Sequence, residues 1–297
     1  MKTFLTTCVV VIAIVSAARA QTSAGPTLLT QENSTRAVAV ESVTLRRDPV
    51  PVVNIHNFSV DDRRSRVTLF GTNLDLLPGE TASAVTARAR DSQSRNYDLT
   101  VEFVGKVPGV DTLTQVVVKL PDALAQAGDV LISVSLRGQT SNEVLFNIEV
   151  QTEPRRVTLP ARRVINGKDN FADAVYSFEL GMNGELSVPF TLNDWDVLFG
   201  NRLDRDTFMV TLAGGDRSRI QDLGALNWSD NFQVPVLTPH PPPTGTEPDV
   251  DAIVGHMYVV HTKDRETDLY FLFRVEALEP LTSVTITWKA VRSPDGN

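Results

Sequence analysis

Alternation of apolar and polar residues with a period of two is the feature that most constrains this chain. Leu99, Val101 and Phe103 alternate with polar residues, and longer alternating runs cover 130–136 and 144–150. Successive side chains of a β-strand point to opposite faces, so each run can bury one face of an extended segment. β-Branched and aromatic residues, which favour strands, fill these runs. The pattern predicts an all-β protein built from short antiparallel strands.

The first half of the chain has the spacing of a sandwich. Strand-like runs recur about every ten residues between 38 and 150, and prolines lie between them. The polar, glycine-containing segment 137–142 separates the last two runs, which is typical of an antiparallel hairpin. The one helix-like piece is 121–128, which ends in glycine. We expect a β-sandwich over 38–150, preceded by a flexible lead-in over 21–37.

A second set of alternating runs follows a break at 151–160, which holds two prolines and an arginine pair and has the composition of a linker. The strongest runs are 250–261, 269–276 and 283–290, joined by polar loops as in a meander. Residues 233–249 include six prolines, which predicts an extended surface loop. The segment 161–297 is therefore expected to form a second antiparallel β domain, either a sandwich or a barrel.

The first twenty residues have the layout of an export signal. Lys2 precedes a mostly apolar core from Leu5 to Val15, and Ala-Arg-Ala at 18–20 fits the small-x-small cleavage pattern. A bilayer-spanning helix needs about 20 apolar residues, so this core is too short to be an anchor. We expect a signal peptide over 1–20, no membrane span in the mature chain, and a location that is secreted, periplasmic or at the cell surface.

Cysteine content and charge exclude several classes of site. The single cysteine, Cys8, lies inside the expected signal, so a mature chain beginning at Gln21 has no disulfide and no thiolate zinc site. The formal net charge is −8, with 36 acidic against 28 basic residues. Nucleic-acid binding proteins usually present a basic face. We therefore expect no nucleic-acid partner.

Three segments of the first half resemble a family of immunoglobulin-like domains from secreted bacterial proteins, common in acidobacteria and related to the IPT/TIG type. They are 47–80 (RDPVPVVNIHNFSVDDRRSRVTLFGTNLDLLPGE), 99–124 and 128–149. The last of these carries Gly128-Asp129-Val130 and Gly138-Gln139-Thr140-Ser141-Asn142, which match the pattern of the family's final two strands. The resemblance covers about 110 residues and implies an immunoglobulin-like β-sandwich.

What this resemblance implies about function is a spacer or adhesive module with no shared catalytic residues. The stretch 255–289 also resembles a β module of secreted proteins from the same bacteria, for which no activity is established. Both resemblances agree with an exported interaction protein.

Histidines and carboxylates offer few metal-ligand patterns. His256 and His261 are five residues apart on one expected strand, so they point to opposite faces. Calcium prefers six to eight oxygen ligands, and acidic residues do cluster, but no EF-hand spacing is present. The acidic clusters are Asp194/Asp196, Asp249/Asp251 and Asp264/Glu266/Asp268. Solvated loop charge explains them as well, so no cofactor is expected, and calcium is the alternative.

Catalytic motifs are absent from the sequence. No G-x-S-x-G elbow and no phosphate-binding glycine loop occurs, and no serine lies beside a histidine in a recognisable motif. Asp194 and Asp196 would lie about 6.5–7 Å apart on a strand, a separation compatible with glycoside hydrolysis. No other feature supports that activity. We expect a non-enzyme.

Aromatic residues are the candidates for ligand contact, because sugar-binding modules stack flat rings on sugar faces. The four candidates are Trp195, Trp228, Tyr258 and Tyr270. The two tyrosines are expected to share one face of neighbouring strands. Burial in the core is the more usual place for a strand aromatic.

The sequence thus favours a non-catalytic exported protein that acts as a cell-surface or extracellular interaction or scaffold module. Its partner would be a cell-surface protein or a polysaccharide. The alternative is a carbohydrate-binding or other ligand-binding protein, or less favoured a carbohydrate-active one, with its site in the C-terminal domain near Trp195, Trp228 and the loop before Val250.

Overall fold

The computed structural model describes residues 25–54, 56, 62–183, 195–210, 218–237, 249–264 and 267–294. Within these ranges the paired strands are antiparallel, and the helical elements are one α-helical turn and two 3₁₀ turns. They are α1 (Phe171–Ala174), η1 (Ala82–Ala84) and η2 (Asp122–Leu124). The predicted all-β fold is confirmed. The expected signal peptide lies outside the described residues.

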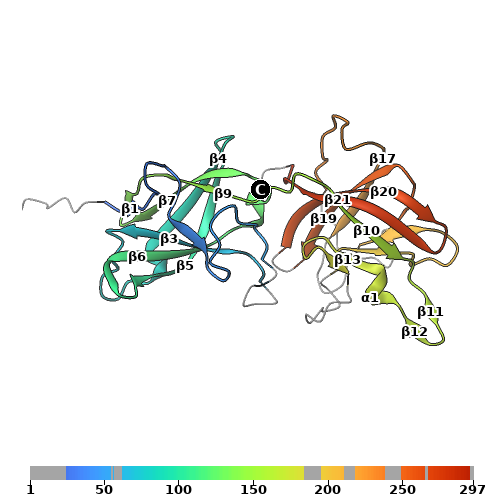
Figure 1. Ribbon diagram of the computed structural model, residues 1–297, viewed down its shortest axis with the longest axis horizontal. Helices are drawn as coiled ribbons and strands as arrows, with labels where there is room; N and C mark the ends of the chain where they lie inside the picture. The colour runs from blue at the N-terminus through green and yellow to red at the C-terminus, as the bar shows by residue number, and fades with distance from the viewer. Residues whose placement is uncertain are drawn as a thin grey trace, which may run out of the picture.

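Two β-rich regions lie side by side along the long axis of the molecule (Figure 1). We call residues 25–150 the N-terminal region and residues 155–294 the C-terminal region. The strands of the N-terminal region are β1 (Thr27–Leu28), β2 (Ala39–Glu41), β3 (Arg66–Thr72), β4 (Val85–Asp91), β5 (Asn96–Val107), β6 (Val110–Lys119), β7 (Asp129–Leu136), β8 (Gln139–Thr140) and β9 (Val144–Asn147). Their order is β1-β3-β6-β5-β4-β7-β8, with β2 beside β3 and β9 beside β7.

Strand β5 belongs to both layers of the N-terminal region. Its first residues, 96–99, pair with β4, and residues 100–107 pair with β6. The register shifts between Val101 and Phe103, a bulge that bends the strand from one layer to the other. The apolar residues of both layers meet in one core, which includes Val67, Val116 and Ile132. The two layers therefore form a sandwich that shares the long strand β5, and the apolar residues of the period-two pattern fill its core.

The hairpin expected near residue 140 is present. Val130 pairs with Phe146 and Ile132 pairs with Val144, between β7 and β9. At the end of β7 the chain turns through two residues with positive φ, Arg137 and Gly138. Two-residue hairpin loops of this kind match the twist of the flanking strands, and glycine accommodates the second position without a steric cost.

The expected flexible lead-in is wrong for residues 27–37, which pack on the N-terminal region. Strand β1 pairs with β3, and the Leu28 side chain is 2% exposed. The Asn142 side chain accepts a hydrogen bond from the Leu28 N–H at 2.8 Å and donates one to its carbonyl at 3.1 Å. The segment around Leu28 is thus held by the side-chain amide of Asn142, more than a hundred residues away in the sequence. The composition of the segment itself does not reveal this contact. Residues 21–24 lie outside the described ranges.

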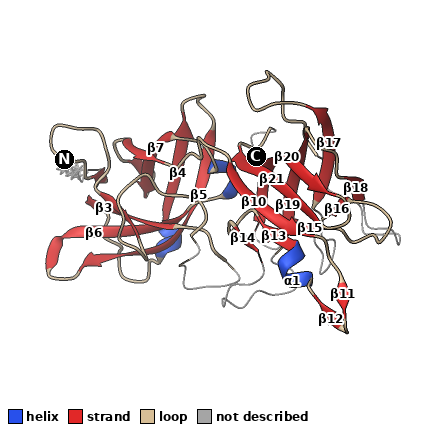
Figure 2. Ribbon diagram, turned by 45° about the vertical axis from the view of Figure 1, so that its right-hand side comes forward, coloured by secondary structure: helices blue, strands red, loops and turns tan. Residues whose placement is uncertain are grey.

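The C-terminal region is built from two five-stranded sheets (Figure 2). One has the order β10-β21-β20-β19-β17, formed by β10 (Arg155–Pro160), β21 (Ser283–Val291), β20 (Thr267–Glu279), β19 (His256–Asp264) and β17 (Arg219–Ala225). The other has the order β14-β13-β15-β16-β18, formed by β14 (Met182–Asn183), β13 (Val175–Ser177), β15 (Val197–Phe199), β16 (Thr207–Met209) and β18 (Asp249–Asp251). A small hairpin, β11 (Val164–Ile165) and β12 (Lys168–Asp169), projects beside them.

Aromatic rings fill the core of the C-terminal region. Phe178 stacks on Phe271 and Phe273, with ring centroids 5.3 and 5.8 Å apart, and Trp288 contacts the same cluster. The expected meander is present as β19, β20 and β21, whose consecutive neighbours pair along their lengths. Residues 249–251, which the sequence placed with this meander, form β18 in the opposite sheet instead.

The expected linker is wrong for residues 155–160, because they form β10 and pair with β21 over their whole length. Val157 and Leu159 alternate with polar residues there, a strand pattern that the two prolines obscured. Most of the predicted proline-rich loop, 238–248, lies outside the described residues. Its first part is described, and Leu237 is 6% exposed against the outer face of β19 and β20.

Candidate functional site: the crevice between the two regions

A buried cluster of charged side chains joins the two regions. Arg64 from the N-terminal region donates at 2.9 Å to Asp122 of η2 and at 2.6 Å to Glu179 of the C-terminal region. The side chains of these three residues are only 3%, 6% and 11% exposed. Two groups of β20 complete the cluster, since the Thr267 hydroxyl donates to Glu179 at 3.0 Å and the Asp268 N–H donates to Asp122 at 2.5 Å. The cluster fixes how the regions meet.

Burial sets the protonation of this cluster. Burial raises the pKa of Asp122 to about 6, with a further rise from the neighbouring Glu179 carboxylate, although Arg64 and the Asp268 N–H act in the opposite direction. Burial alone would lower the pKa of Arg64, but the Glu179 and Asp122 carboxylates raise it above its usual value. Arg64 is therefore held as a cation between two carboxyl groups.

Gln151 forms a second tie where the chain passes from one region to the other. Its side chain donates to the Trp288 carbonyl at 3.2 Å and accepts from the Ala290 N–H at 3.1 Å, both on β21. Its own N–H donates to the Gln126 side chain at 2.7 Å, in the N-terminal region. One residue thus connects both regions by three hydrogen bonds.

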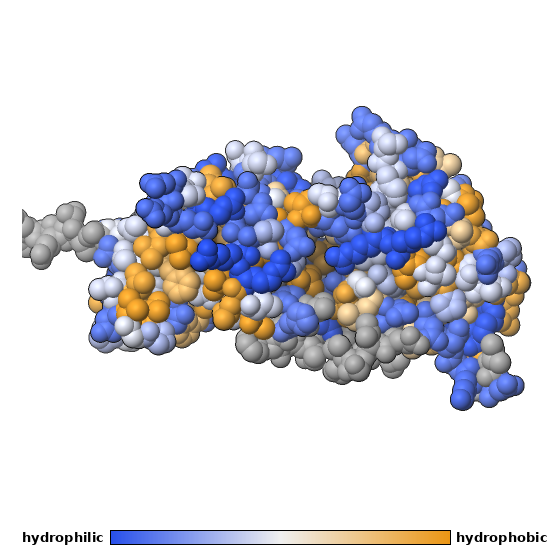
Figure 3. All heavy atoms as spheres, viewed as in Figure 1, coloured by the Kyte–Doolittle hydropathy of each residue, from blue (hydrophilic) through white to orange (hydrophobic). Residues whose placement is uncertain are grey.

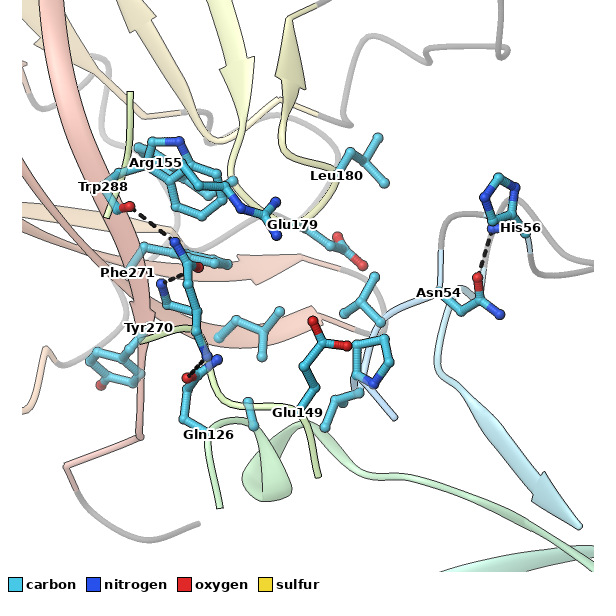
Figure 4. A pocket seen from close by; sticks show the side chains of 18 of the residues that line it. Asn54, His56, Gln126, Glu149, Arg155, Glu179, Leu180, Tyr270, Phe271 and Trp288 are labelled. Carbon is cyan, nitrogen blue, oxygen red and sulfur yellow. Dashed lines mark hydrogen bonds between the residues drawn. The ribbon is translucent and has the colours of Figure 1, made fainter. Parts of the chain in front are cut away.

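A crevice of about 340 Å³ opens at this junction. It is lined from the N-terminal region by residues such as Arg46, Gln126 and Glu149, and from the C-terminal region by Arg155 and Trp288. Figure 4 shows Arg155 lying against Trp288 on one side, with Gln126 and Glu149 on the other. Strongly hydrophilic residues flank the junction on the face seen in Figure 3. The crevice therefore has a polar rim contributed by both regions.

Three charged residues of the crevice have no ion-pair partner within the described part of the chain. They are Arg46, Glu149 and Arg155. The Arg155 guanidinium lies 5.4 Å from the centre of the Trp288 ring, which is cation–π contact. The guanidinium also lies close to Gly181, whose lack of a side chain leaves room for it, since an added Cβ would come within 2.9 Å. Arg155 is thus a positioned cation that faces solvent rather than a carboxylate.

The aromatic residues predicted to contact a ligand are mostly buried. Trp195 is 5% exposed and packs edge-on against Phe171, and Tyr258 is fully buried with its ring stacked on Phe273. Burial raises the pKa of the Tyr258 hydroxyl to about 12. Tyr270 is 2% exposed and stacks on His261. None of these three rings offers a free face to a sugar.

The expectation that Tyr258 and Tyr270 share one face is wrong. Tyr258 is paired with Phe273 and points into the core between the sheets, whereas Tyr270 is paired with His261 on the outer face of the same sheet. The two positions have opposite phase across the antiparallel register. Tyr270 lies near the junction instead, where it lines the crevice.

Trp228 is half-buried on the outer face of the C-terminal region. Its indole N–H donates to the Thr287 hydroxyl at 3.0 Å, and the Lys289 ammonium lies 5.1 Å from the ring centre. It also packs against the Met257 and Leu272 cluster. The structure therefore does not bring Trp195 and Trp228 together into one site.

The acidic side chains of these clusters that the structure describes, Asp196, Asp249, Asp251 and Asp268, contact cations, a histidine or the backbone. Asp249 and Asp251 contact Arg202 and Arg205. In the parts of the chain that the structure describes, no group of three or more potential ligands could hold a metal ion. Asp194 and Glu266 lie outside those parts, as does His240.

Other polar groups also have structural partners. Asp196 is buried and accepts the Phe178 N–H at 2.5 Å. His261 contacts Asp268 at 2.7 Å and the Leu237 carbonyl at 3.0 Å, and His256 contacts Asp222 at 2.9 Å.

The crevice residues were not identified from the sequence. Arg155 stood in a segment with linker composition, and Glu149 stood at the end of a strand. They meet because β10 pairs with β21, the last strand that the structure describes. The alternation of Val157 and Leu159 is the one signal that could have placed Arg155 on a strand.

Comparison with known proteins does not assign this chain to a family. No protein-family model and no curated protein matches this chain. Within the described residues, no helix has the length and apolar character needed to cross a membrane. Among solved structures, the chain is similar to a DUF4466 family protein from Parabacteroides merdae, with 10% sequence identity and a TM-score of 0.28, over 86% of this chain and 97% of that chain. A TM-score this low carries no argument about function.

Proposed function

We propose that this chain is a non-catalytic exported interaction protein whose recognition site is the crevice between its two regions. The observation that supports the proposal is the set of charged side chains, Arg46, Glu149 and Arg155, that line the crevice without an ion-pair partner among the described residues. Binding sites are commonly concave, lie between domains, and carry a few convergent polar groups.

The rigid junction supports the same proposal. A site shared by two regions needs both walls to keep their spacing, since a loose site loses binding free energy to the ordering of its walls. Here the buried Arg64 cluster and the bridging Gln151 hold the walls. The two regions would then act as one recognition surface, as expected of an extracellular interaction module.

Export is the second part of the proposal. It is supported by residues 1–20, whose charge, apolar core and Ala-Arg-Ala ending match a cleavable signal. Expression of the full chain with a C-terminal tag in a bacterial host tests it. We expect the tagged protein outside the cytoplasm, with Gln21 as the first residue by mass spectrometry. An uncleaved chain in the cytoplasm would contradict export.

Binding is tested with labelled protein on a panel of polysaccharides and bacterial cell-surface fractions. Arg46→Glu reverses a charge on the crevice rim, and Arg47→Glu makes the same change at an exposed neighbour that does not line the crevice. We expect saturable binding that Arg46→Glu weakens and Arg47→Glu leaves unchanged. Binding that is equally sensitive to both variants would place the recognition site elsewhere, and release of hydrolysis products would refute a non-catalytic role.

A further inference from the structure

We propose that the crevice binds a small ligand through a carboxylate group, with Arg155 as its main contact. This inference rests on the proposed function and names the class of ligand. It starts from the charge of the chain: the net charge is −8, yet two arginines in this crevice, Arg46 and Arg155, have no carboxylate partner among the described residues. An acidic protein has carboxylates available to neutralise such cations, and here they are left open to solvent.

The placement of Arg155 is suited to a carboxylate. Contact with the Trp288 ring holds the guanidinium, so less side-chain entropy is lost when a ligand binds. A planar guanidinium can donate two parallel hydrogen bonds to a carboxylate. Arg155 also lies on β10, a paired strand, rather than on a free loop.

The opposite wall supplies complementary groups. The Glu149 carboxylate is a hydrogen-bond acceptor for a hydroxyl or an ammonium group, and Gln126 uses its side-chain oxygen for Gln151, which leaves its amide N–H groups as donors. In Figure 4 both residues lie across the crevice from Arg155. The other acid of the crevice, Glu179, already contacts Arg64 and Thr267. The ligand should therefore carry donors in addition to its carboxylate.

The volume limits the size of this ligand. Binding pockets for drug-sized ligands range from about 300 to 1,000 Å³, and the crevice is about 340 Å³. That space suits one sugar ring or a dipeptide. A sugar acid and an amino acid or peptide terminus share the required chemistry, namely a carboxylate flanked by donors.

The test is an isothermal titration of the full mature chain with four probes: galacturonate, galactose, diglycine and diglycine amide. We expect the acid of at least one pair to bind saturably and about tenfold or more tightly than the counterpart that lacks the carboxylate, because a charged hydrogen-bonded pair is lost in the latter. Galacturonate binding would identify a sugar acid, and diglycine binding a peptide terminus. Failure of both acids to bind more tightly than their counterparts would overturn the proposal.

Variants locate the contact. Arg155→Gln should weaken binding of the acid about tenfold or more, and Arg155→Lys should recover part of it. Arg156→Gln is the matched control, since Arg156 is the next residue of β10, exposed and outside the crevice. Melting curves of all three variants show whether they remain folded. Unchanged affinity in a folded Arg155→Gln protein would overturn the assignment.

Glu149→Gln separates the two ligand sources further. It should weaken diglycine, whose ammonium group would contact Glu149, more than galacturonate, which offers only hydroxyls there. The proposed function and the ligand class can fail separately. Polysaccharide or cell-surface binding that depends on Arg46, with no preference for acids among the small probes, would retain the interaction role and refute the carboxylate.

Discussion

The two regions both bury a core between β-sheets, but they fill it with different kinds of side chain. Among the described residues, the core of the N-terminal region is mostly aliphatic and holds two buried aromatic residues, Tyr97 and Phe146. In the part of the C-terminal region that the structure describes, the core between the sheets contains eight: Tyr176, Phe178, Phe199, Phe208, Tyr258, Phe271, Phe273 and Trp288. One C-terminal sheet has strands of only two or three residues, whereas the other includes the 13-residue β20 and the N-terminal region includes the 12-residue β5.

This difference shows how short strands can be stabilised. A three-residue strand such as β15 makes few ladder hydrogen bonds, so its position must be fixed by side-chain contacts. Aromatic side chains bury more surface per residue than aliphatic ones and add ring–ring contacts. The N-terminal region instead relies on long ladders and on β5, which connects its two layers.

The largest expected effect comes from removing one ring from the aromatic core. Trp288 is 2% exposed and contacts Tyr176, Phe178 and Phe271. Trp288→Ala should lower the free energy of unfolding by about 3–5 kcal/mol. Leu69→Ala, at a fully buried position of the N-terminal region, removes a smaller side chain and should cost less, within the range of about 2–5 kcal/mol for buried leucine. Urea unfolding followed by circular dichroism measures both. A greater loss for Leu69→Ala would contradict the comparison.

The next effect concerns the junction between the regions. Arg64→Ala leaves Asp122 and Glu179 buried without their cation and should cost about 3 kcal/mol. Because the loss falls on contacts between regions, calorimetry should show two separated transitions in place of one. The variant Arg64→Met with Asp122→Leu and Glu179→Met removes all three charges and should recover much of the loss. A single unshifted transition for Arg64→Ala would show that the cluster does not couple the regions.

Acidity should affect the same junction. The pKa of Asp122 is raised from 3.8 to about 6, so the folded chain binds more protons than the unfolded chain between these pH values. The contribution of Asp122 to the free energy of unfolding therefore falls as pH rises from about 4 to about 6, by about 3 kcal/mol at most. The pKa of nearby Asp62 is lowered to about 2, so its own titration lies below this window.

The measurement is urea unfolding at pH 4, 5, 6 and 7 for the natural chain and for Asp122→Asn. The variant lacks the titrating group, so the difference in unfolding free energy between the two proteins should change across the window and stay constant above it. Parallel curves throughout would show that the pKa of Asp122 is not raised.

The smallest expected effect concerns the first strand. Asn142→Ala removes both hydrogen bonds to Leu28 and should cost about 1–2 kcal/mol. Hydrogen exchange should rise in β1 and remain unchanged in the C-terminal region. Ser141→Ala is a suitable control, since the Ser141 hydroxyl contacts the Val134 N–H and the Asn142 backbone carbonyl and leaves the Asn142 side chain in place. Undisturbed exchange at Leu28 would indicate that β1 is held by its ladder alone.

The sequence predicted the local parts of this fold and missed the distant ones. The hairpin of β7 and β9 and the meander of β19 to β21 join neighbouring segments, so the alternation of their residues was sufficient to find them. The pairing of β10 with β21 joins segments more than a hundred residues apart, and no local pattern carries that information. The prediction that Trp195 and Tyr258 contact a ligand is wrong because the sequence does not tell whether an aromatic residue is buried or exposed.

The candidate site was missed for the same reason. Its residues come from a turn near Arg46, from the end of β9 near Glu149, and from β10. None of these segments has a recognisable motif, and the crevice exists only through the way the two regions meet. The composition of 151–160 did indicate charged residues such as Arg155 between the two halves of the chain. It did not indicate which residues of the N-terminal region lie opposite them.

The pairing of β10 with β21 also has a consequence for biogenesis. The described strands of the N-terminal region are complete by Asn147, so this region can fold while the rest of the polypeptide is still emerging from the ribosome or a translocation pore. The first strand of the C-terminal region must wait for the last one, which ends at Val291. Vectorial emergence therefore leaves Arg155 and its neighbours without their strand partner until β21 has emerged, so the crevice is completed after the N-terminal region.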